Sequence, residues 1–165
     1  MREAREMSAM DVYLMQHGEA TTEAENPDRP LTEAGRAAVQ RVSARAGAVG
    51  VHVGVCVHSG KLRAEQTAQL LMEHVGDRAD VSARQGLGPK DDVAPTAQWL
   101  RTTTEQDAIA VIGHLPFLDR LASLLVAGDE EAHVVRFQMG ALVRLEPDDE
   151  GEGFAVGWVL PPGLT

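Results

Sequence analysis

The chain has 165 residues, a length that suits one domain of ordinary size. Its formal net charge is −10, from 15 Lys and Arg against 25 Asp and Glu, which argues against binding to nucleic acid or to an anionic membrane surface. A single cysteine, Cys56, excludes a disulfide framework, and the sequence shows neither a membrane-spanning run nor a signal peptide. We therefore expect a cytoplasmic protein, with a flexible polar leader at residues 1–10 and one domain at 11–165. Whether translation starts at Met1 or Met10 stays open.

Apolar runs alternate with segments of helical periodicity through most of the chain. The elements predicted first are a strand at Asp11–Met15, a polar loop at Thr21–Arg29, a helix from the N-cap Thr32 to about Ala46, a strand at Val51–Val57, a helix from Lys61 to about His74, and a weak strand at Ala79–Ala83.

The second half continues the alternation and then changes character. The predicted elements are a loop at Gln85–Pro95, a helix at Pro95–Thr103, a strand at Ala108–Ile112, a helix at Phe117–Val126, and two strands at Val134–Leu145 and Phe154–Leu160. An acidic turn at Pro147–Gly153 separates the last two strands, so we expect them to form a hairpin at one edge of the sheet.

The alternation of strands and helices predicts a mostly parallel central sheet covered on both faces, that is, a three-layer α/β/α sandwich. In such sheets, functional residues gather in the loops that follow the carboxyl ends of the strands. Three loops meet this rule: Gln16–Glu19, His58–Arg63 and Gly113–Pro116.

These loops carry groups that suit a phosphoryl ligand. His17 and His114 each stand beside a glycine, while Ser59 and Arg63 lie at the start of a helix. Arginine binds phosphate oxygens with two hydrogen bonds, and a helix N-terminus offers free N–H groups to an anion. An imidazole can act as a nucleophile or as a proton donor. No two histidines have metal-ligand spacing, so neither a metal nor another cofactor is predicted.

Four motifs occur in order: LMQHGEA at 14–20, DRPLTEAG at 28–35, HSGKLRAEQTA at 58–68 and VIGHLPFLDRLASLL at 111–125, followed by WVLPP at 158–162. On these motifs, the chain from Val12 to Pro162 resembles the histidine phosphatase superfamily and, within it, the phosphohistidine phosphatases of the SixA type. The resemblance implies a phosphoglycerate-mutase-like fold and a metal-independent phosphatase.

The resemblance also implies roles for particular residues. His17 matches the nucleophile that becomes phosphorylated, and Arg63 and His114 match groups that bind the phosphoryl oxygens. The further candidates for phosphate binding are Gln16, Gly18, Ser59 and Lys61. In the second motif, Asp28, Arg29 and Thr32 are interpreted as mainly structural.

The sequence departs from the family pattern at Gln16, where an arginine is usual. Replacing a charged hydrogen bond by a neutral one could weaken phosphate or transition-state binding roughly tenfold. Lys61 stands where relatives usually carry an apolar residue and could return the positive charge. Its side chain reaches the pocket only if the segment 59–62 is still loop, because positions 61 and 63 of a regular helix point to nearly opposite sides.

Larger relatives that act on sugar phosphates supply a glutamate as general acid. The nearest candidates here are Asp91 and Asp92, for which a solvated turn is the simpler interpretation. A phosphohistidine leaves as an imidazole, which accepts its proton near neutral pH, so a compact site without an inserted acid suits a P–N substrate. Of the other histidines, His58 is a candidate for the pocket rim; His52, His74 and His133 are interpreted as structural and without partners.

The leading hypothesis is a phosphohistidine phosphatase that acts on a signalling or phosphotransfer protein through a covalent phospho-His17 intermediate. One alternative is a phosphomonoesterase for a small metabolite, with Asp91 or Asp92 as the acid. Another is a non-catalytic module that only binds phosphoryl groups, because Gln16 replaces the arginine. The expected partner is a phosphorylated histidine-containing protein or a small phosphorylated substrate, with neither nucleic acid nor membrane. The identity of the substrate, the turnover rate and the oligomeric state stay open.

Overall fold

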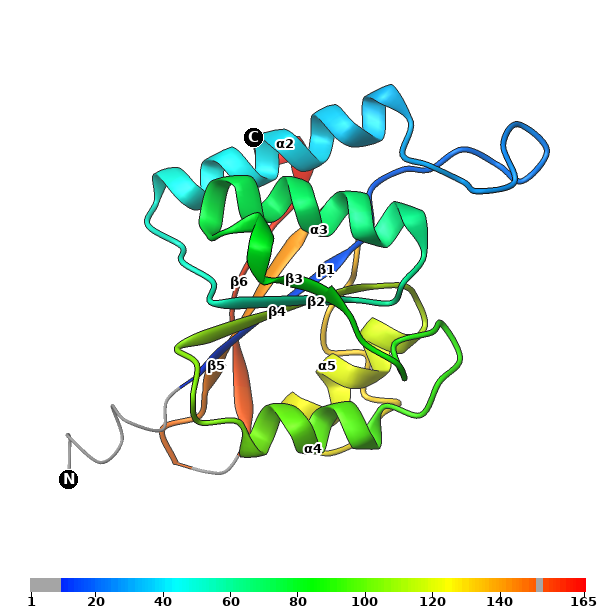
Figure 1. Ribbon diagram of the computed structural model, residues 1–165. Helices are drawn as coiled ribbons and strands as arrows, with labels where there is room; N and C mark the ends of the chain where they lie inside the picture. Colours follow the sequence, from blue (N-terminus) through cyan, green and yellow to red (C-terminus); the bar gives the residue numbers. More distant parts are fainter. Residues whose placement is uncertain (1–9, 151–152) are drawn as a thin grey trace.

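Six strands form one sheet in a computed structural model that describes residues 10–150 and 153–165 (Figure 1). The strands are β1 (Asp11–Gln16), β2 (Val55–His58), β3 (Val81–Ala83), β4 (Ala108–Gly113), β5 (Leu142–Pro147) and β6 (Phe154–Leu160). Their order is β3-β2-β4-β1-β5-β6. The first four pair in parallel, whereas β5 is antiparallel to both of its neighbours, so the predicted hairpin at the sheet edge is confirmed.

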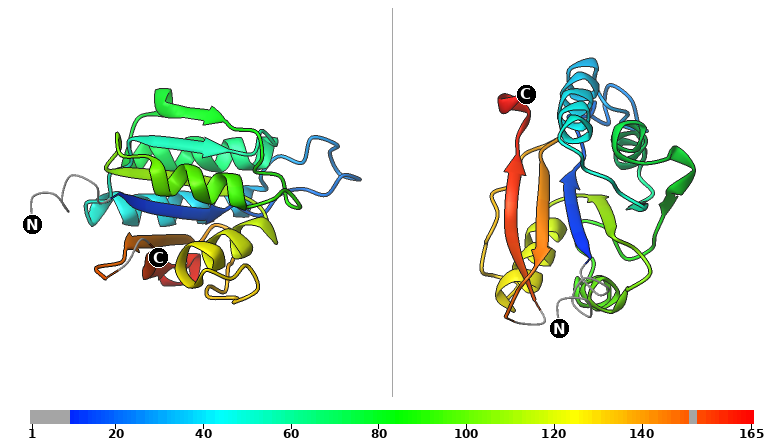
Figure 2. Two further views of the ribbon diagram at one scale, coloured as in Figure 1. Left: turned by 90° about the horizontal axis from the view of Figure 1, so that it is seen from below. Right: turned by 90° about the vertical axis from the view of Figure 1, so that its left-hand side faces the viewer.

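Helices cover both faces of this sheet, which confirms the predicted three-layer α/β/α sandwich. The helices are α2 (Glu33–Ala48), α3 (Leu62–Val75), α4 (Ala94–Thr102) and α5 (Phe117–Ala127), with short 3₁₀ helices η1 (Arg78–Asp80) and η2 (Pro162–Leu164). Helices α2 and α3 lie on one face, and α4 and α5 on the other (Figure 2). No helix within the described ranges is both long enough and apolar enough to cross a membrane.

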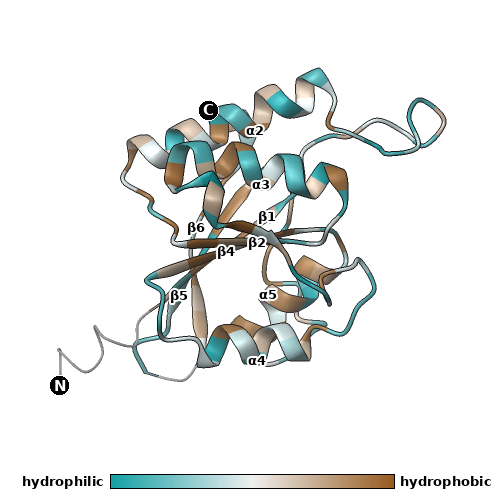
Figure 3. Cartoon of the chain, viewed as in Figure 1, coloured by the Kyte–Doolittle hydropathy of each residue, from teal (hydrophilic) through white to brown (hydrophobic). Residues whose placement is uncertain are grey.

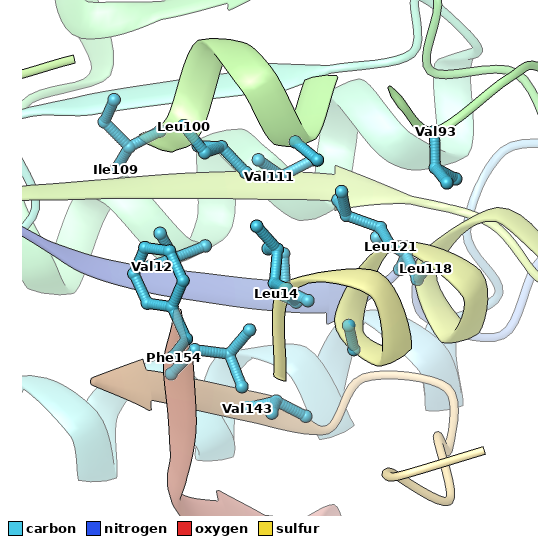
Figure 4. Packing of buried hydrophobic residues seen from close by; sticks show 14 of the residues in the cluster. Val12, Leu14, Val93, Leu100, Ile109, Val111, Leu118, Leu121, Val143 and Phe154 are labelled. Carbon is cyan, nitrogen blue, oxygen red and sulfur yellow. The ribbon is translucent and has the colours of Figure 1, made fainter. Parts of the chain in front are cut away.

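The two faces of the sheet form two hydrophobic cores because side chains of a strand alternate between its faces. In β1, Val12 and Leu14 pack toward α5, while Tyr13 and Met15 pack toward α2 and α3. A strand buried on both faces reads as a continuous apolar run, and the central strands are accordingly the most hydrophobic part of the chain (Figure 3). On the α4 and α5 side, Leu118 and Leu121 of α5 meet Leu14 and Val111 of the sheet (Figure 4).

The prediction of one strand over Val134–Leu145 is wrong in its first part. Strand β5 begins only at Leu142, and 134–141 is irregular. Helix α5 leads away from the carboxyl edge of the sheet, so the chain must return to that edge before an antiparallel strand can begin. Val135 is buried against the core on the way, and this burial explains the apolar pattern that suggested a strand.

The strand predicted at Val51–Val57 is also shorter, beginning at Val55. Met10 is buried beneath the start of β1, and residues 1–9 of the predicted leader lie outside the described residues.

The carboxyl ends of the central strands lie together at one edge of the sheet. Gln16 at the end of β1 is level with Gly113 at the end of β4, and His58 at the end of β2 is level with Ile112. Strand β5 starts at the same edge, since Leu142 pairs with Met15. The three loops singled out from the sequence therefore meet at this carboxyl edge.

Candidate active site

His17 immediately follows β1, and its backbone N–H donates to the carbonyl of Gly113, 3.1 Å away. Its side chain is only 8% exposed. The ring Nδ1 lies 2.7 Å from the carbonyl oxygen of Gly18. A carbonyl can only accept, so Nδ1 carries the proton and the neutral ring keeps a free lone pair on Nε2. His17 Nε2 is thereby left free to act as a nucleophile.

The backbone of Gly18 connects this nucleophile to helix α3. Its N–H donates to Thr67 Oγ1 at 3.1 Å, and the Thr67 hydroxyl in turn donates to the carbonyl of Arg63 at 2.8 Å. Gly18 was predicted to bind phosphate, but its N–H is engaged by Thr67. A Cβ at Gly18 would lie 2.8 Å from Val39 Cγ2 of α2, so only glycine fits this close approach.

Sequence reasoning missed Thr67. It stands four residues after Arg63 and therefore on the same helix face, which is the one signal that could have indicated it.

We expect Thr67→Val to lower both stability and turnover. The valine keeps the shape of the side chain but leaves the buried Gly18 N–H without an acceptor, a loss of about 1–3 kcal/mol in the free energy of unfolding. Chemical denaturation measures this loss, and single-turnover kinetics measure the effect of the displaced His17. The control is Thr67→Ser, which keeps the hydroxyl; equal behaviour of the two variants would contradict a role for the hydrogen bond.

His114 faces His17 from the end of β4. The two ring centroids are 5.0 Å apart, and the His114 side chain is buried. Ser59, which follows β2, brings its Oγ to 2.6 Å from His114 Nε2. Ser59 was predicted to bind phosphate, and in the structure its hydroxyl contacts the ring of the second histidine.

Arg63 supplies an unpaired donor beside the two histidines. It lies in the first turn of α3, and its Nε is buried without a hydrogen-bond partner among the described residues. Buried polar groups are nearly always hydrogen-bonded, so this N–H is available to an acceptor that enters the site. An oxyanion is the acceptor that a guanidinium binds best.

Positive charge gathers around both histidines, although the whole chain is acidic. The pKa of His17 is lowered, first by burial and then by the charges of Arg63 and Arg29, against the opposing effect of its hydrogen bond to Gly18. The pKa of His114 falls to about 3, through burial, His17, Arg63, Lys61 and Arg29 in that order. Both imidazoles are therefore neutral near pH 7, in a setting that attracts anions.

The lowered pKa of His17 predicts the acid limb of the pH profile. A histidine nucleophile is active when neutral, and protonation of His17 requires a pH below the ordinary histidine value of 6.5. We expect kcat/KM to hold as pH falls through 6.5 and to decline only at lower pH. A profile measured from pH 5 to 8, corrected for non-enzymatic hydrolysis, tests this; an acid limb centred at or above 6.5 would contradict it.

Arg29 is the second residue whose role was missed. It was interpreted as mainly structural, and its Nε does donate to the carbonyl of Thr21 within its own loop, at 2.9 Å. The loop is tied to α3 because the Leu31 N–H donates to Gln66 Oε1 at 2.8 Å. This tie brings the charge of Arg29 close enough to lower the pKa of His17, His114 and Arg63 alike.

Lys61 precedes the helix, as the sequence analysis required for its side chain to reach the pocket. Helix α3 begins at Leu62, and Lys61 has extended backbone angles, φ −72° and ψ 140°. Its charge is one of those that lower the pKa of His114, although its side chain is exposed. Gln16 lies at the end of β1, where its carbonyl accepts a hydrogen bond from the Gly140 N–H at 2.9 Å.

The remaining candidates have local roles. His58 Nδ1 accepts from the Gly60 N–H at 3.0 Å and so shapes the turn that leads to Ser59. Asp91 Oδ2 accepts from the Gly88 N–H, and Asp92 Oδ1 from the Ala94 N–H, as expected for turn residues. The prediction that His133 has no partner is wrong. Its Nδ1 lies 2.6 Å from Asp119 Oδ2, a contact between the loop and α5 that the sequence separation concealed.

The assembled groups are a neutral imidazole with a free lone pair, a second neutral imidazole, and a guanidinium with an unpaired donor. Within residues 10–150 and 153–165, no three His, Cys, Asp or Glu side chains are placed to hold a metal ion. The arrangement suits attack by His17 on a phosphoryl group whose oxygens are bound by Arg63 and His114.

The chain is similar in sequence and fold to several known proteins. Residues 12–88 match the model of the histidine phosphatase superfamily (branch 1). An uncharacterized protein of Picosynechococcus is 30% identical over 168 residues, which cover 92% of this chain and all of that one. The protein histidine phosphatase SixA, solved with tungstate, superposes with a TM-score of 0.81 at 25% identity, over 93% of this chain and 98% of SixA. The α-ribazole phosphatase of Shigella flexneri shares the fold, with a TM-score of 0.65 at 16% identity over 92% and 96% of the two chains.

Proposed function

This chain belongs to the histidine phosphatase superfamily, and from that membership we propose that the phosphatase acts on phosphohistidine carried by another protein. The observation that carries the proposal is the buried, neutral His17, with Nε2 free and the unpaired Arg63 beside it. The partner we propose is a histidine-containing protein of a cytoplasmic signalling or phosphotransfer system.

The reaction proceeds in two displacements at phosphorus. His17 Nε2 attacks in line, the P–N bond of the substrate breaks, and the leaving imidazole takes up a proton from solvent. Water then attacks the phosphorus of phospho-His17, which releases inorganic phosphate and restores the free histidine. In both steps, Arg63 and His114 bind the equatorial oxygens, where negative charge develops.

The leaving group favours a P–N substrate over a phosphate ester. An alkoxide needs a strong proton donor as it departs, whereas an imidazole is protonated near neutral pH. Asp91 and Asp92, the candidate acids, are occupied with hydrogen bonds inside their own turn. This arrangement supports phosphohistidine over the ester of a small metabolite.

Because Gln16 stands where the family motif has an arginine, a non-catalytic module that only binds phosphoryl groups is the competing hypothesis. We propose that Arg29 supplies the charge that Gln16 lacks, because it acts on all three catalytic groups, whereas Lys61 acts on His114 alone. Both arginine and glutamine donate hydrogen bonds, but only the charged donor contributes about 1.5–3 kcal/mol.

We therefore expect Arg29→Gln to lower kcat/KM roughly tenfold, as estimated for the same exchange at position 16. Adding Gln16→Arg to this variant should restore much of the loss, since it returns one guanidinium to the site. Steady-state kinetics of the wild type, both single variants and the double variant measure the coupling. If Gln16→Arg raises activity by the same factor with and without Arg29, the two positions do not compensate for one another.

The test of the function compares two substrates. Free phosphohistidine and p-nitrophenyl phosphate are offered to the protein at equal concentration, and phosphate release is followed. We expect the P–N substrate to be preferred. Faster turnover of the ester would indicate a metabolite phosphatase, and phosphate binding without turnover of either would indicate a binding module.

A further inference from the structure

The two histidines of this site are buried side chains. His17 is 8% exposed and His114 is 3% exposed, so a phosphohistidine must insert its side chain to reach them. A histidine side chain is short. A protein that presents one must therefore bring its own surface against the mouth of the site.

Two exposed apolar side chains lie at the same carboxyl edge of the sheet as the catalytic histidines. Leu115, which is 38% exposed, directly follows His114, and Met139, which is 46% exposed, directly precedes Gly140. The Gly140 N–H donates to the carbonyl of Gln16, the residue before the nucleophile, so Met139 is fixed at the same edge. Both residues lie on segments that adjoin the histidine-bearing ends of β1 and β4, which is the edge that a protein substrate must approach.

An acidic loop also lies near the catalytic site. The segment Thr21–Arg29 projects beyond the rest of the molecule at the end of the sheet where the strands finish (Figures 1 and 2). Glu23 and Glu25 are exposed on it. Burial and Arg29 lower the pKa of Arg63 and Glu23 opposes them, which places the Glu23 carboxylate within electrostatic range of the catalytic arginine.

We propose that Leu115 and Met139, together with Glu23 and Glu25, form the docking surface for the protein substrate. The surface fits a protein that presents its phosphohistidine beside an apolar patch, with basic side chains placed to meet the acidic loop. The inference rests on the proposed function and deepens it, because it specifies which face of the substrate protein must surround the phosphohistidine.

The test uses one double variant and two substrates. L115S/M139S is assayed against a histidine phosphotransfer domain phosphorylated with phosphoramidate, and against free phosphohistidine. We expect kcat/KM to fall at least about tenfold for the phosphorylated domain and to change less than about twofold for the free amino acid. The matched control is V49S/V156S, two exposed valines away from the carboxyl edge, for which both rates should stay at the wild-type level.

Each other outcome has a distinct meaning. Unchanged rates on both substrates would overturn the docking surface and leave the function standing. Equal losses on both would also overturn it, because the two residues would then be shaping the catalytic site itself. A wild-type protein that hydrolyses neither phosphohistidine substrate would overturn the proposed function, and the docking inference with it.

Discussion

Replacing His17 by alanine should abolish turnover and leave no covalent phosphoenzyme. In the proposed mechanism, the free Nε2 of this residue is the atom that forms the new bond to phosphorus. Loss of a nucleophile lowers kcat by roughly four orders of magnitude or more. Any residual acceleration over the uncatalysed reaction comes from the groups that bind the phosphoryl oxygens. Rapid quench with a ³²P-labelled substrate, followed by gel separation at alkaline pH, measures the phosphoenzyme directly.

A matched control is His74→Ala, which removes an exposed histidine from the last turn of α3. This variant should retain wild-type turnover and labelling. The His17→Ala protein should still bind inorganic phosphate, because Arg63 is untouched. Labelling that persists in His17→Ala would mean that another residue carries the phosphoryl group and that the mechanism is wrong.

Replacing Arg63 by alanine should have the second-largest effect. The buried Nε of this residue has no partner among the described residues, so its hydrogen bonds are available to the phosphoryl oxygens. Removing one donor of this kind typically lowers kcat by 10²–10³, or about 2.7–4 kcal/mol of transition-state stabilisation. The affinity for inorganic phosphate or tungstate should fall as well, and titration calorimetry measures it.

Comparing Arg63→Ala with Arg63→Lys separates the contribution of the positive charge from that of the hydrogen-bond geometry. Lysine keeps the charge but lacks the planar pair of donors, so it should recover only part of the loss. Arg78→Ala is the surface control, since Arg78 pairs with Glu73 in an exposed salt bridge. If Arg63→Ala leaves both turnover and phosphate affinity unchanged, the orphaned guanidinium is not part of the site.

The substitutions also separate the enzyme from a mere binding module. A module would lose phosphate affinity in Arg63→Ala and lose nothing measurable in His17→Ala. An enzyme loses turnover in both variants, and the phosphoenzyme vanishes only where the nucleophile is gone. The two variants together therefore decide the question that Gln16 raises.

Local patterns in the sequence determined the layers of the fold and pointed to the candidate catalytic groups. Apolar runs such as Ala108–Ile112 predict buried strands because a strand covered on both faces must be apolar throughout. The N-cap at Thr32 was likewise predictable from neighbouring residues alone, and its side chain accepts a hydrogen bond from the Gly35 N–H. His17 and His114 directly follow strands and Arg63 lies in the helix after β2, so all three were predicted at one edge because parallel strands end there.

The tertiary structure alone decided how these groups are held. Thr67 bonds to Gly18 across 49 positions, and Leu31 bonds to Gln66 across 35, so no periodicity within a window of the sequence reports either contact. The charge of Arg29 reaches the site through that second contact. The start of β5 was likewise set by the return of the chain to the carboxyl edge, which is a geometric requirement. Sequence pattern records whether a residue is buried, whereas the hydrogen bonds that aim a side chain form only after distant segments have packed.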